Sequence, residues 1–254
     1  RVLMIGDSYV YGDFVNDNQT FPSQLEQRLR GACRDVLVIN AGLGGTTVVD
    51  QAFMLRRTLP LDPDLVILLY VPDDFQNMAR PQSQWEQLAD NRLKKSRFPL
   101  SIVYPLVRET ALWNLVLKAR AKSAIRRTDT ALRQEWARDS VETGSHLRDG
   151  YGRALVAFRD TLDARRIPFV FAMFPGWREL QGASANLTWI QRFADTHAMR
   201  GVNLLPALQA SHLPAEKLYL IRDGHPGPVG YATAADDLAE NVLHGPVAFP
   251  SCAR

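Results

Sequence analysis

The chain lacks the features that mark membrane, disulfide-rich and nucleic-acid-binding proteins. It has only two cysteines, Cys33 and Cys252, which leaves open either one bridge or two inert thiols. No run of 18 apolar residues occurs, so these residues contain no transmembrane helix. The net charge is only +3, and no stripe of lysine and arginine alternates with aromatic residues, so we expect no nucleic-acid partner. Neither a Cys/His metal-ligand spacing nor a dinucleotide fingerprint is present, so we expect no metal and no cofactor.

The start of the sequence bears on where the protein acts. No signal peptide is visible, and the chain opens on Arg1, directly before a strand and without an initiator methionine. We therefore expect the natural protein to extend upstream, which favours an extracytoplasmic location, secreted or periplasmic. Membrane association would come only from that upstream part or from the insertion described below.

What the sequence does contain is an alternation of strands and helices. Short apolar runs predict buried strands at 2–5, 36–39 and 65–70. Helices are expected between them, at about 20–31, capped by Thr20 and closed by Gly31, and at about 47–57. Strand, helix and strand at this spacing predict a parallel sheet with right-handed crossovers.

The alternation stops between about 76 and 150. There we expect no strand, but helices near 84–95, 106–127 and 129–139, the second of them started by Pro105. A helical insertion packed on the sheet edge, a lid over the active site and a membrane-surface element are the alternatives. The insertion follows directly after the end of a strand, which is the position that suits a lid.

The alternation resumes after residue 150. Strands are predicted at 167–174 and 202–205, which brings the sheet to about five strands. The chain ends in a helix on which four apolar residues share one face: Tyr231, Ala235, Leu238 and Val242.

Polar residues follow the ends of several predicted strands and precede the last helix. They are Ser8, the glycine-rich turn at 42–45, Asp73, Asp74 and Asn77, and Asp223 with His225. In a parallel sheet such loops meet at one edge, where ligands bind. Together they supply a serine nucleophile, a histidine base, a carboxylate to orient that base and backbone N–H groups for an oxyanion.

These blocks resemble the SGNH/GDSL hydrolases. The first block is Gly6-Asp7-Ser8 with Gly12, the second is the 40–45 segment ending at Gly45, and the last is Asp223-Gly-His225-Pro. The resemblance covers roughly 1–75 and 150–245 and implies a three-layer α/β sandwich of the flavodoxin-like type, but it says little about the insertion. We expect a single domain over 1–254, with the helical insertion at about 76–150. The resemblance also implies roles: Ser8 is the nucleophile, His225 the base, Asp223 the orienter, and the N–H groups of Ser8 and Gly45 bind the oxyanion.

Two departures from the family pattern matter. The third block of the family carries an oxyanion asparagine, and the aligned residue here is Asp73. An ionised carboxylate has no proton to donate. Either Asp73 is protonated, or Asn77 substitutes for it, or the enzyme is slow on simple esters, and we favour the last. The second departure is that the family often has its aspartate where Arg222 stands. We assign Asp223 instead, with a backbone carbonyl as the alternative partner of His225.

The other histidines, at 146, 197, 212 and 244, have no serine or carboxylate at a suggestive spacing, and we expect no catalytic role for them. Asp7 is expected to brace the loop as a hydrogen-bond acceptor.

Our functional hypothesis is therefore a serine esterase that cleaves a small or carbohydrate-linked ester through an acyl-enzyme. The alternatives are an O-acyltransferase acting on a glycan, and a non-catalytic carbohydrate-binding or scaffold domain with a degraded oxyanion hole. The substrate, the choice between hydrolysis and transfer, and the oligomeric state do not follow from the sequence.

Overall fold

The protein is described from a computed structural model, which covers residues 1–78, 83–107, 110–111, 115, 145–182, 185–220 and 223–245. It divides into two compact units, one formed by 1–80 with 148–254 and the other by 81–147. Each unit is described by itself.

The first unit is built on a five-stranded sheet. Its strands are β1 (Val2–Gly6), β2 (Val38–Gly42), β3 (Leu65–Tyr70), β4 (Phe169–Met173) and β5 (Gly201–Asn203). All neighbours pair in parallel, in the order β2-β1-β3-β4-β5. This order confirms the predicted parallel α/β fold. The direction of winding reverses between β1 and β3, the point at which doubly wound sheets bind their ligands.

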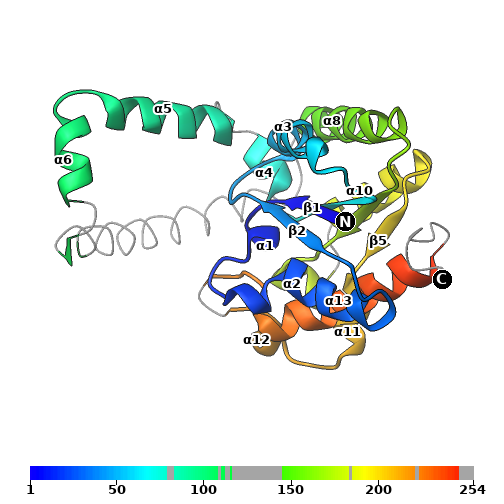
Figure 1. The fold of residues 1–254 in the computed structure, drawn as a ribbon. Coiled ribbons are helices and arrows are strands. Elements are labelled where there is room, and N and C mark those ends of the chain that lie inside the picture. Colours follow the sequence, from blue (N-terminus) through cyan, green and yellow to red (C-terminus); the bar gives the residue numbers. More distant parts are fainter. Residues whose placement is uncertain are drawn as a thin grey trace. The chain divides into compact units, whose positions relative to one another are not determined.

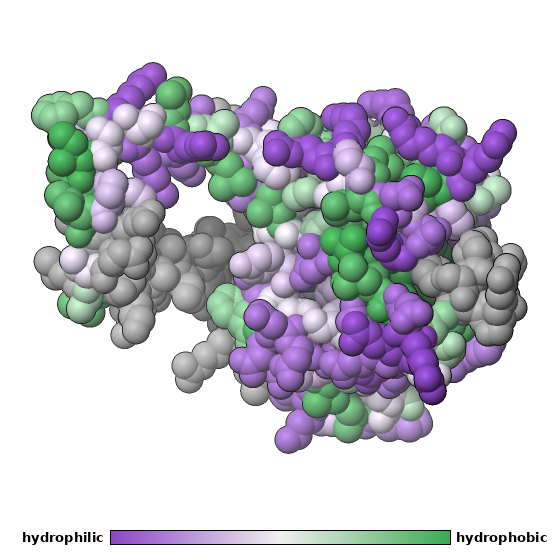
Figure 2. Space-filling model, viewed as in Figure 1, coloured by the Kyte–Doolittle hydropathy of each residue, from purple (hydrophilic) through white to green (hydrophobic). Residues whose placement is uncertain are grey.

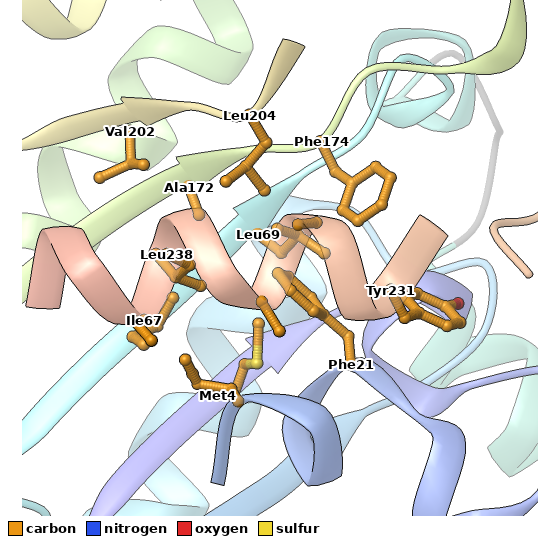
Figure 3. Close-up of a cluster of buried hydrophobic side chains, with 14 of the residues drawn as sticks. Met4, Phe21, Ile67, Leu69, Ala172, Phe174, Val202, Leu204, Tyr231 and Leu238 are labelled. Carbon is orange, nitrogen blue, oxygen red and sulfur yellow. The ribbon is translucent and has the colours of Figure 1, made fainter. Parts of the chain in front are cut away.

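Helices cover both faces of this sheet because its side chains alternate between two apolar cores. Met4, Ile67 and Leu69 point to one face, where they pack against α2 (Phe21–Ala32) and α13 (Pro228–His244). Figure 3 shows these side chains meeting Phe21 of α2 and Leu238 of α13.

The intervening residues of the same strands face the second core. Leu3, Ile5 and Leu68 belong to this core, together with buried side chains of three helices. The helices are α3 (Val48–Thr58), α8 (Ser145–Asp163) and α10 (Ala185–Thr196). Figure 1 shows α3 and α8 on the side of the sheet opposite to α2 and α13. The structure thus has the three layers that the resemblance implies.

Local chemistry explains where the framework helices begin. Thr20 caps α2 by accepting the N–H of Ser23 at 3.4 Å, and a proline follows in the first turn. Thr47 caps α3 in a capping box with Asp50. The predicted end of α2 at Gly31 is wrong: the helix continues to Ala32, and Gly31 is an exposed helical residue.

The second strand also differs from its prediction. The apolar run predicted a strand at 36–39, but β2 spans 38–42. Pairing with β1 decides this register, since Val2 lies opposite Val38 and Gly6 opposite Gly42. The strand therefore continues into the predicted glycine-rich turn. β4 and β5 are likewise shorter than predicted, and Leu205 begins a helix rather than ending a strand.

Short helices that the periodicity did not predict fill the connections. They are α1 (Ser8–Tyr11), η1 (Asp17–Gln19), η2 (Leu59–Leu61), α4 (Asp74–Met78), α9 (Trp177–Gln181), α11 (Leu205–Ala210) and α12 (Ala215–Leu218). Each is too short to show an amphipathic repeat in the sequence.

In the second unit, α5 (Gln84–Ser96) confirms the helix predicted near 84–95, and Ser83 caps it. α6 (Leu100–Val107) contains Pro105 in its interior, so the prediction that Pro105 starts a helix is wrong. Carbonyls just before α6 accept hydrogen bonds from its first turn: Arg97 accepts the Ser101 N–H at 2.9 Å, and Pro99 accepts the Val103 N–H at 3.1 Å. Figure 2 shows strongly hydrophobic colouring on α6.

Other predictions for this region fall outside the described residues. These are the helix at 129–139 and most of the helix at 106–127. Cys252 also lies outside them, so the possible bridge to the buried Cys33 stays a prediction. None of the helices in the described ranges is both long enough and apolar enough to cross a membrane.

Candidate active site

Ser8 lies at the carboxyl end of β1, as predicted, but it begins the one-turn helix α1 rather than a loop. Asp7 caps that helix by accepting the N–H of Tyr9 at 2.9 Å. This contact confirms that Asp7 braces the turn. Gly12 ends the helix with a left-handed φ of 90°, a conformation that favours glycine.

Glycines allow α1 to lie against the sheet. A Cβ atom on Gly42 would be 2.1 Å from the backbone nitrogen of Tyr11. A Cβ atom on Gly6 would be 2.5 Å from Cγ2 of Val10. Gly42 therefore meets the backbone of the nucleophile helix, while Gly6 leaves room for the Val10 side chain, which explains one glycine in each of the first two family blocks.

His225 reaches Ser8 from the loop before α13. The loop is closed by two backbone hydrogen bonds of 2.8 Å, from the Leu220 N–H to the His225 carbonyl and from the Gly224 N–H to the Leu220 carbonyl. The His225 Nε2 atom lies 2.8 Å from the Ser8 Oγ atom. Its Nδ1 atom is hydrogen-bonded to Oδ2 of Asp223. The structure thus brings together a serine, a histidine and an aspartate that lie far apart in the sequence.

The surroundings of His225 set its proton affinity. Burial alone would lower the pKa of this imidazole. The hydrogen bond and the negative charge of Asp223, with the charges of Asp7 and Asp13, outweigh burial and raise the pKa above its ordinary value. The partner of Nδ1 is the Asp223 carboxylate, as we assigned. The alternative family position, Arg222, lies outside the described residues.

Sequence reasoning missed the role of Tyr9. Its hydroxyl donates a hydrogen bond of 3.2 Å to the carbonyl of Gly224, the residue between Asp223 and His225. Its ring packs edge-on against Phe174, with centroids 5.5 Å apart, and lies 5.2 Å from the His225 ring. Tyr9 therefore ties the histidine loop to the helix that begins with the nucleophile.

The turn between β2 and α3 is tied to the end of β1. The N–H of Leu43 donates to the Gly6 carbonyl at 3.1 Å, and the hydroxyl of Thr46 donates to the same oxygen at 3.2 Å. A Cβ atom on Gly44 would lie 3.7 Å from that of Ser8. Gly45 follows with a φ of 75°. The turn therefore places glycine backbone beside the nucleophile.

The loop after β3 brings two consecutive carboxylates to the same edge. Asp74 is fully buried and accepts hydrogen bonds from the Tyr151 hydroxyl at 3.1 Å and from the Val71 N–H at 3.4 Å. Burial, together with the charge of Asp7, holds the pKa of Asp74 well above its ordinary range. The Asp74 side chain is thus buried inside the protein and hydrogen-bonded there.

Asp73, by contrast, is exposed to solvent. Its negative charge raises the pKa of the Asp7 carboxyl, which places it near the nucleophile turn. Asn77, the residue we named as a substitute donor, is half-buried in α4, where its N–H donates to the Asp73 carbonyl at 2.9 Å. The oxyanion role of either side chain stays a prediction.

Asp7 itself is buried beneath Ser8. Burial raises its pKa to about 6, and the charge of Asp73 adds to that effect, while the N–H of Tyr9 opposes it. Its Oδ2 atom accepts a hydrogen bond of 3.3 Å from the Ser8 hydroxyl. Ser8 therefore lies between the imidazole of His225 and the carboxyl group of Asp7, whose pKa is raised.

The remaining histidines lie elsewhere. His197 makes a 2.9 Å hydrogen bond with the Phe193 carbonyl, and His244 pairs with Glu240 at 3.5 Å. His146 and His212 are exposed. In the described ranges, no group of three or more His, Cys, Asp or Glu side chains is arranged to hold a metal ion.

Comparisons with known proteins identify this fold. Three solved structures share the fold, all at low sequence identity. A G-D-S-L family lipolytic protein from Desulfitobacterium hafniense has a TM-score of 0.55 at 14% identity, over 94% of this chain and 97% of its own. The acetyl xylan esterase AlAXEase has a TM-score of 0.55 at 16% identity, over 95% and 100%. A catalytic mutant of Axe2, an acetylxylan esterase from Geobacillus stearothermophilus, has a TM-score of 0.52 at 12% identity, over 98% and 94%. The likeness shows a flavodoxin-like hydrolase fold.

The family follows from the sequence model. Residues 4–233 match the GDSL-like lipase/acylhydrolase family. The chain belongs to this family of hydrolases. No curated protein matches the sequence.

Proposed function

We propose that the protein is a serine esterase that cleaves a small or carbohydrate-linked ester. The observation that carries this proposal is the 2.8 Å contact between Ser8 Oγ and His225 Nε2, with Asp223 on the other ring nitrogen. A base at hydrogen-bond distance is what a serine needs to become a nucleophile. The names of the two acetyl xylan esterases with the same fold support an acetylated sugar as one kind of substrate.

In the proposed mechanism Ser8 Oγ attacks the carbonyl carbon of the ester while His225 Nε2 takes the hydroxyl proton. The N–H groups of Ser8 and Gly45 stabilise the oxyanion that forms. His225 then gives the proton to the leaving alcohol, which leaves an acyl group on Ser8. A water molecule, deprotonated by His225, attacks this acyl group and releases the acid. Asp223 fixes the imidazole tautomer and stabilises the imidazolium in both steps.

Asp73 leads us to expect that this mechanism runs slowly. A carboxylate in place of the family's asparagine supplies no N–H, and one lost oxyanion donor typically costs about 10² to 10³ in rate. We therefore propose slow turnover of simple esters. The same observation supports the second candidate, a carbohydrate-binding domain that has the framework but little activity.

Hydrolysis of p-nitrophenyl acetate by the full chain tests the proposal, with Ser8→Ala beside the wild type. We expect measurable release of p-nitrophenol that is lost in Ser8→Ala, because that substitution removes the nucleophile and keeps the fold. Ser101→Ala is the matched control, since Ser101 is an exposed serine on α6 of the second unit, and it should keep its activity.

Three outcomes test the nucleophile and separate the candidates. Turnover that survives in Ser8→Ala would contradict the proposed nucleophile. Absence of turnover, together with absence of labelling by a fluorophosphonate, would favour the binding domain. For an O-acyltransferase, adding a glycan acceptor would give the acylated glycan in place of free acid.

A further inference from the structure

A polar hollow of about 570 Å³ adjoins the candidate active site, and nothing in the proposed chemistry uses it. It lies between the segment after α1 and the end of β2. Two aromatic side chains in its lining are strongly exposed, Tyr11 at 55% and Phe14 at 70%. Asp13 and Asp17 also line it.

Residues that line the hollow lie close to the nucleophile and to its base. The rings of Phe14 and His225 meet edge-on, with centroids 5.6 Å apart. A Cβ atom on Gly44 would lie 3.6 Å from Asp13 Oδ2 and 3.7 Å from Ser8 Cβ, so one glycine lies between that carboxylate and the nucleophile. A single ligand can therefore place an ester at Ser8 and extend into the hollow.

The backbone presents Phe14 outwards. Phe14 has a φ of 67°, a left-handed conformation that bulky residues rarely adopt. The ring is mostly exposed, so burial in a core does not account for its position. Such outliers gather at sites that contact ligands.

The chemistry of the lining selects the ligand. Aromatic faces pack against the apolar C–H faces of sugar rings. Carboxylate oxygens accept hydrogen bonds from hydroxyl groups. Among the described residues of the lining, none is lysine, arginine or histidine, while two are aspartates, so an anionic ligand would be repelled.

We propose that this hollow binds a neutral sugar residue in the alcohol part of the substrate. The inference rests on the proposed esterase function for its link to catalysis, but binding of the sugar itself can be measured independently. Phe14 and Tyr11 would supply packing surfaces, and Asp13 would accept hydrogen bonds from sugar hydroxyls.

Titration of the full chain with xylotriose tests binding directly, with trigalacturonate as the anionic comparison. We expect xylotriose to bind more tightly than trigalacturonate. Phe14→Ala and Tyr11→Ala should each weaken xylotriose binding by about 3- to 10-fold, the loss expected for one aromatic contact. Phe53→Ala is the control, because Phe53 is an exposed phenylalanine on α3, outside the lining. Equal thermal midpoints would establish that the variants fold.

A kinetic comparison links the hollow to catalysis. For acetylated xylotriose, Phe14→Ala should lower kcat/KM by a larger factor than it does for p-nitrophenyl acetate, which has no sugar. Equal factors for the two esters would overturn the proposal, as would no xylotriose binding or equal binding of trigalacturonate. If xylotriose binds but neither ester is hydrolysed, the esterase function fails while the sugar site stands.

Discussion

Gly42→Ala tests whether the direct backbone contact between α1 and β2 is required for stability and activity. The added Cβ atom would lie 2.1 Å from the nitrogen and 2.7 Å from the Cα atom of Tyr11, and 2.6 Å from the carbonyl carbon of Val10. All three neighbours are backbone atoms, so no side chain can rotate away. Either β2 or α1 must move by about 1 Å to restore ordinary contact distances.

The size of the effect follows from this geometry. Overpacking costs typically 1 to 3 kcal/mol, and the upper value applies here because backbone must shift. We therefore expect Gly42→Ala to lower the free energy of unfolding by about 3 kcal/mol. Since α1 begins with Ser8, a displacement of about 1 Å would also lower kcat/KM by about 10²-fold.

Gly31→Ala is the matched control. Gly31 lies inside α2, is exposed, and would have no atom within 4 Å of an added Cβ. The same substitution should there raise the free energy of unfolding by about 0.5 to 1 kcal/mol, because alanine favours the helix. Urea unfolding measures both stabilities, and hydrolysis of p-nitrophenyl acetate measures the activities. An unchanged urea midpoint with full activity in Gly42→Ala would refute this account of the close approach.

Four further predictions concern the site. Because Asp223 raises the pKa of His225, the acid limb of the kcat/KM pH profile should lie above about pH 6.5 and move to lower pH in Asp223→Asn. A limb that stays in place would contradict this. Tyr9→Phe removes one hydrogen bond to the histidine loop, so kcat should fall about 2- to 10-fold with KM unchanged in steady-state kinetics. An unchanged kcat, or a loss confined to KM, would count against positioning. Asp73→Asn should raise ester turnover about 10-fold or more, since it restores an oxyanion donor. An equal or lower rate would contradict the proposal that Asp73 limits the activity. The folded state binds the proton of Asp7 more tightly, with a pKa of about 6 against 3.8. Stability in urea should therefore rise as the pH falls from about 6 to 4, and Asp7→Asn should flatten this slope; an identical slope in that variant would contradict the linkage.

Much of the fold could be predicted because its three central strands, β1, β3 and β4, are wholly buried. The run at 65–70 became β3 with the predicted bounds, since both faces of the strand pack on apolar layers. The strand at 36–39 was misplaced because pairing with β1, rather than hydrophobicity, sets its register. The helix α1 has only four residues, and its cap and its packing on Gly42 form it rather than any periodicity.

The sequence allowed us to predict which loops meet at the candidate site. It did not allow us to predict which side chains contact each other there. Topology alone gathers the ends of β1, β2 and β3 at one edge. The hydrogen bond from Tyr9 to Gly224 joins residues that no local pattern connects. The exposure of Phe14 depends equally on a left-handed backbone that the sequence does not reveal.

The pairing of β3 with β4 shows how far the length of the segment between them can vary. Val66 lies opposite Phe169, although residues 71–168, including the second unit, separate the two strands. The entropy lost on closing a loop grows only with the logarithm of its length, by about 0.6 kcal/mol for each doubling. Removing 81–147 would therefore change the closure cost by roughly 1 kcal/mol. As far as chain closure is concerned, this segment can be lengthened, shortened or replaced with little effect on the sheet that holds Ser8.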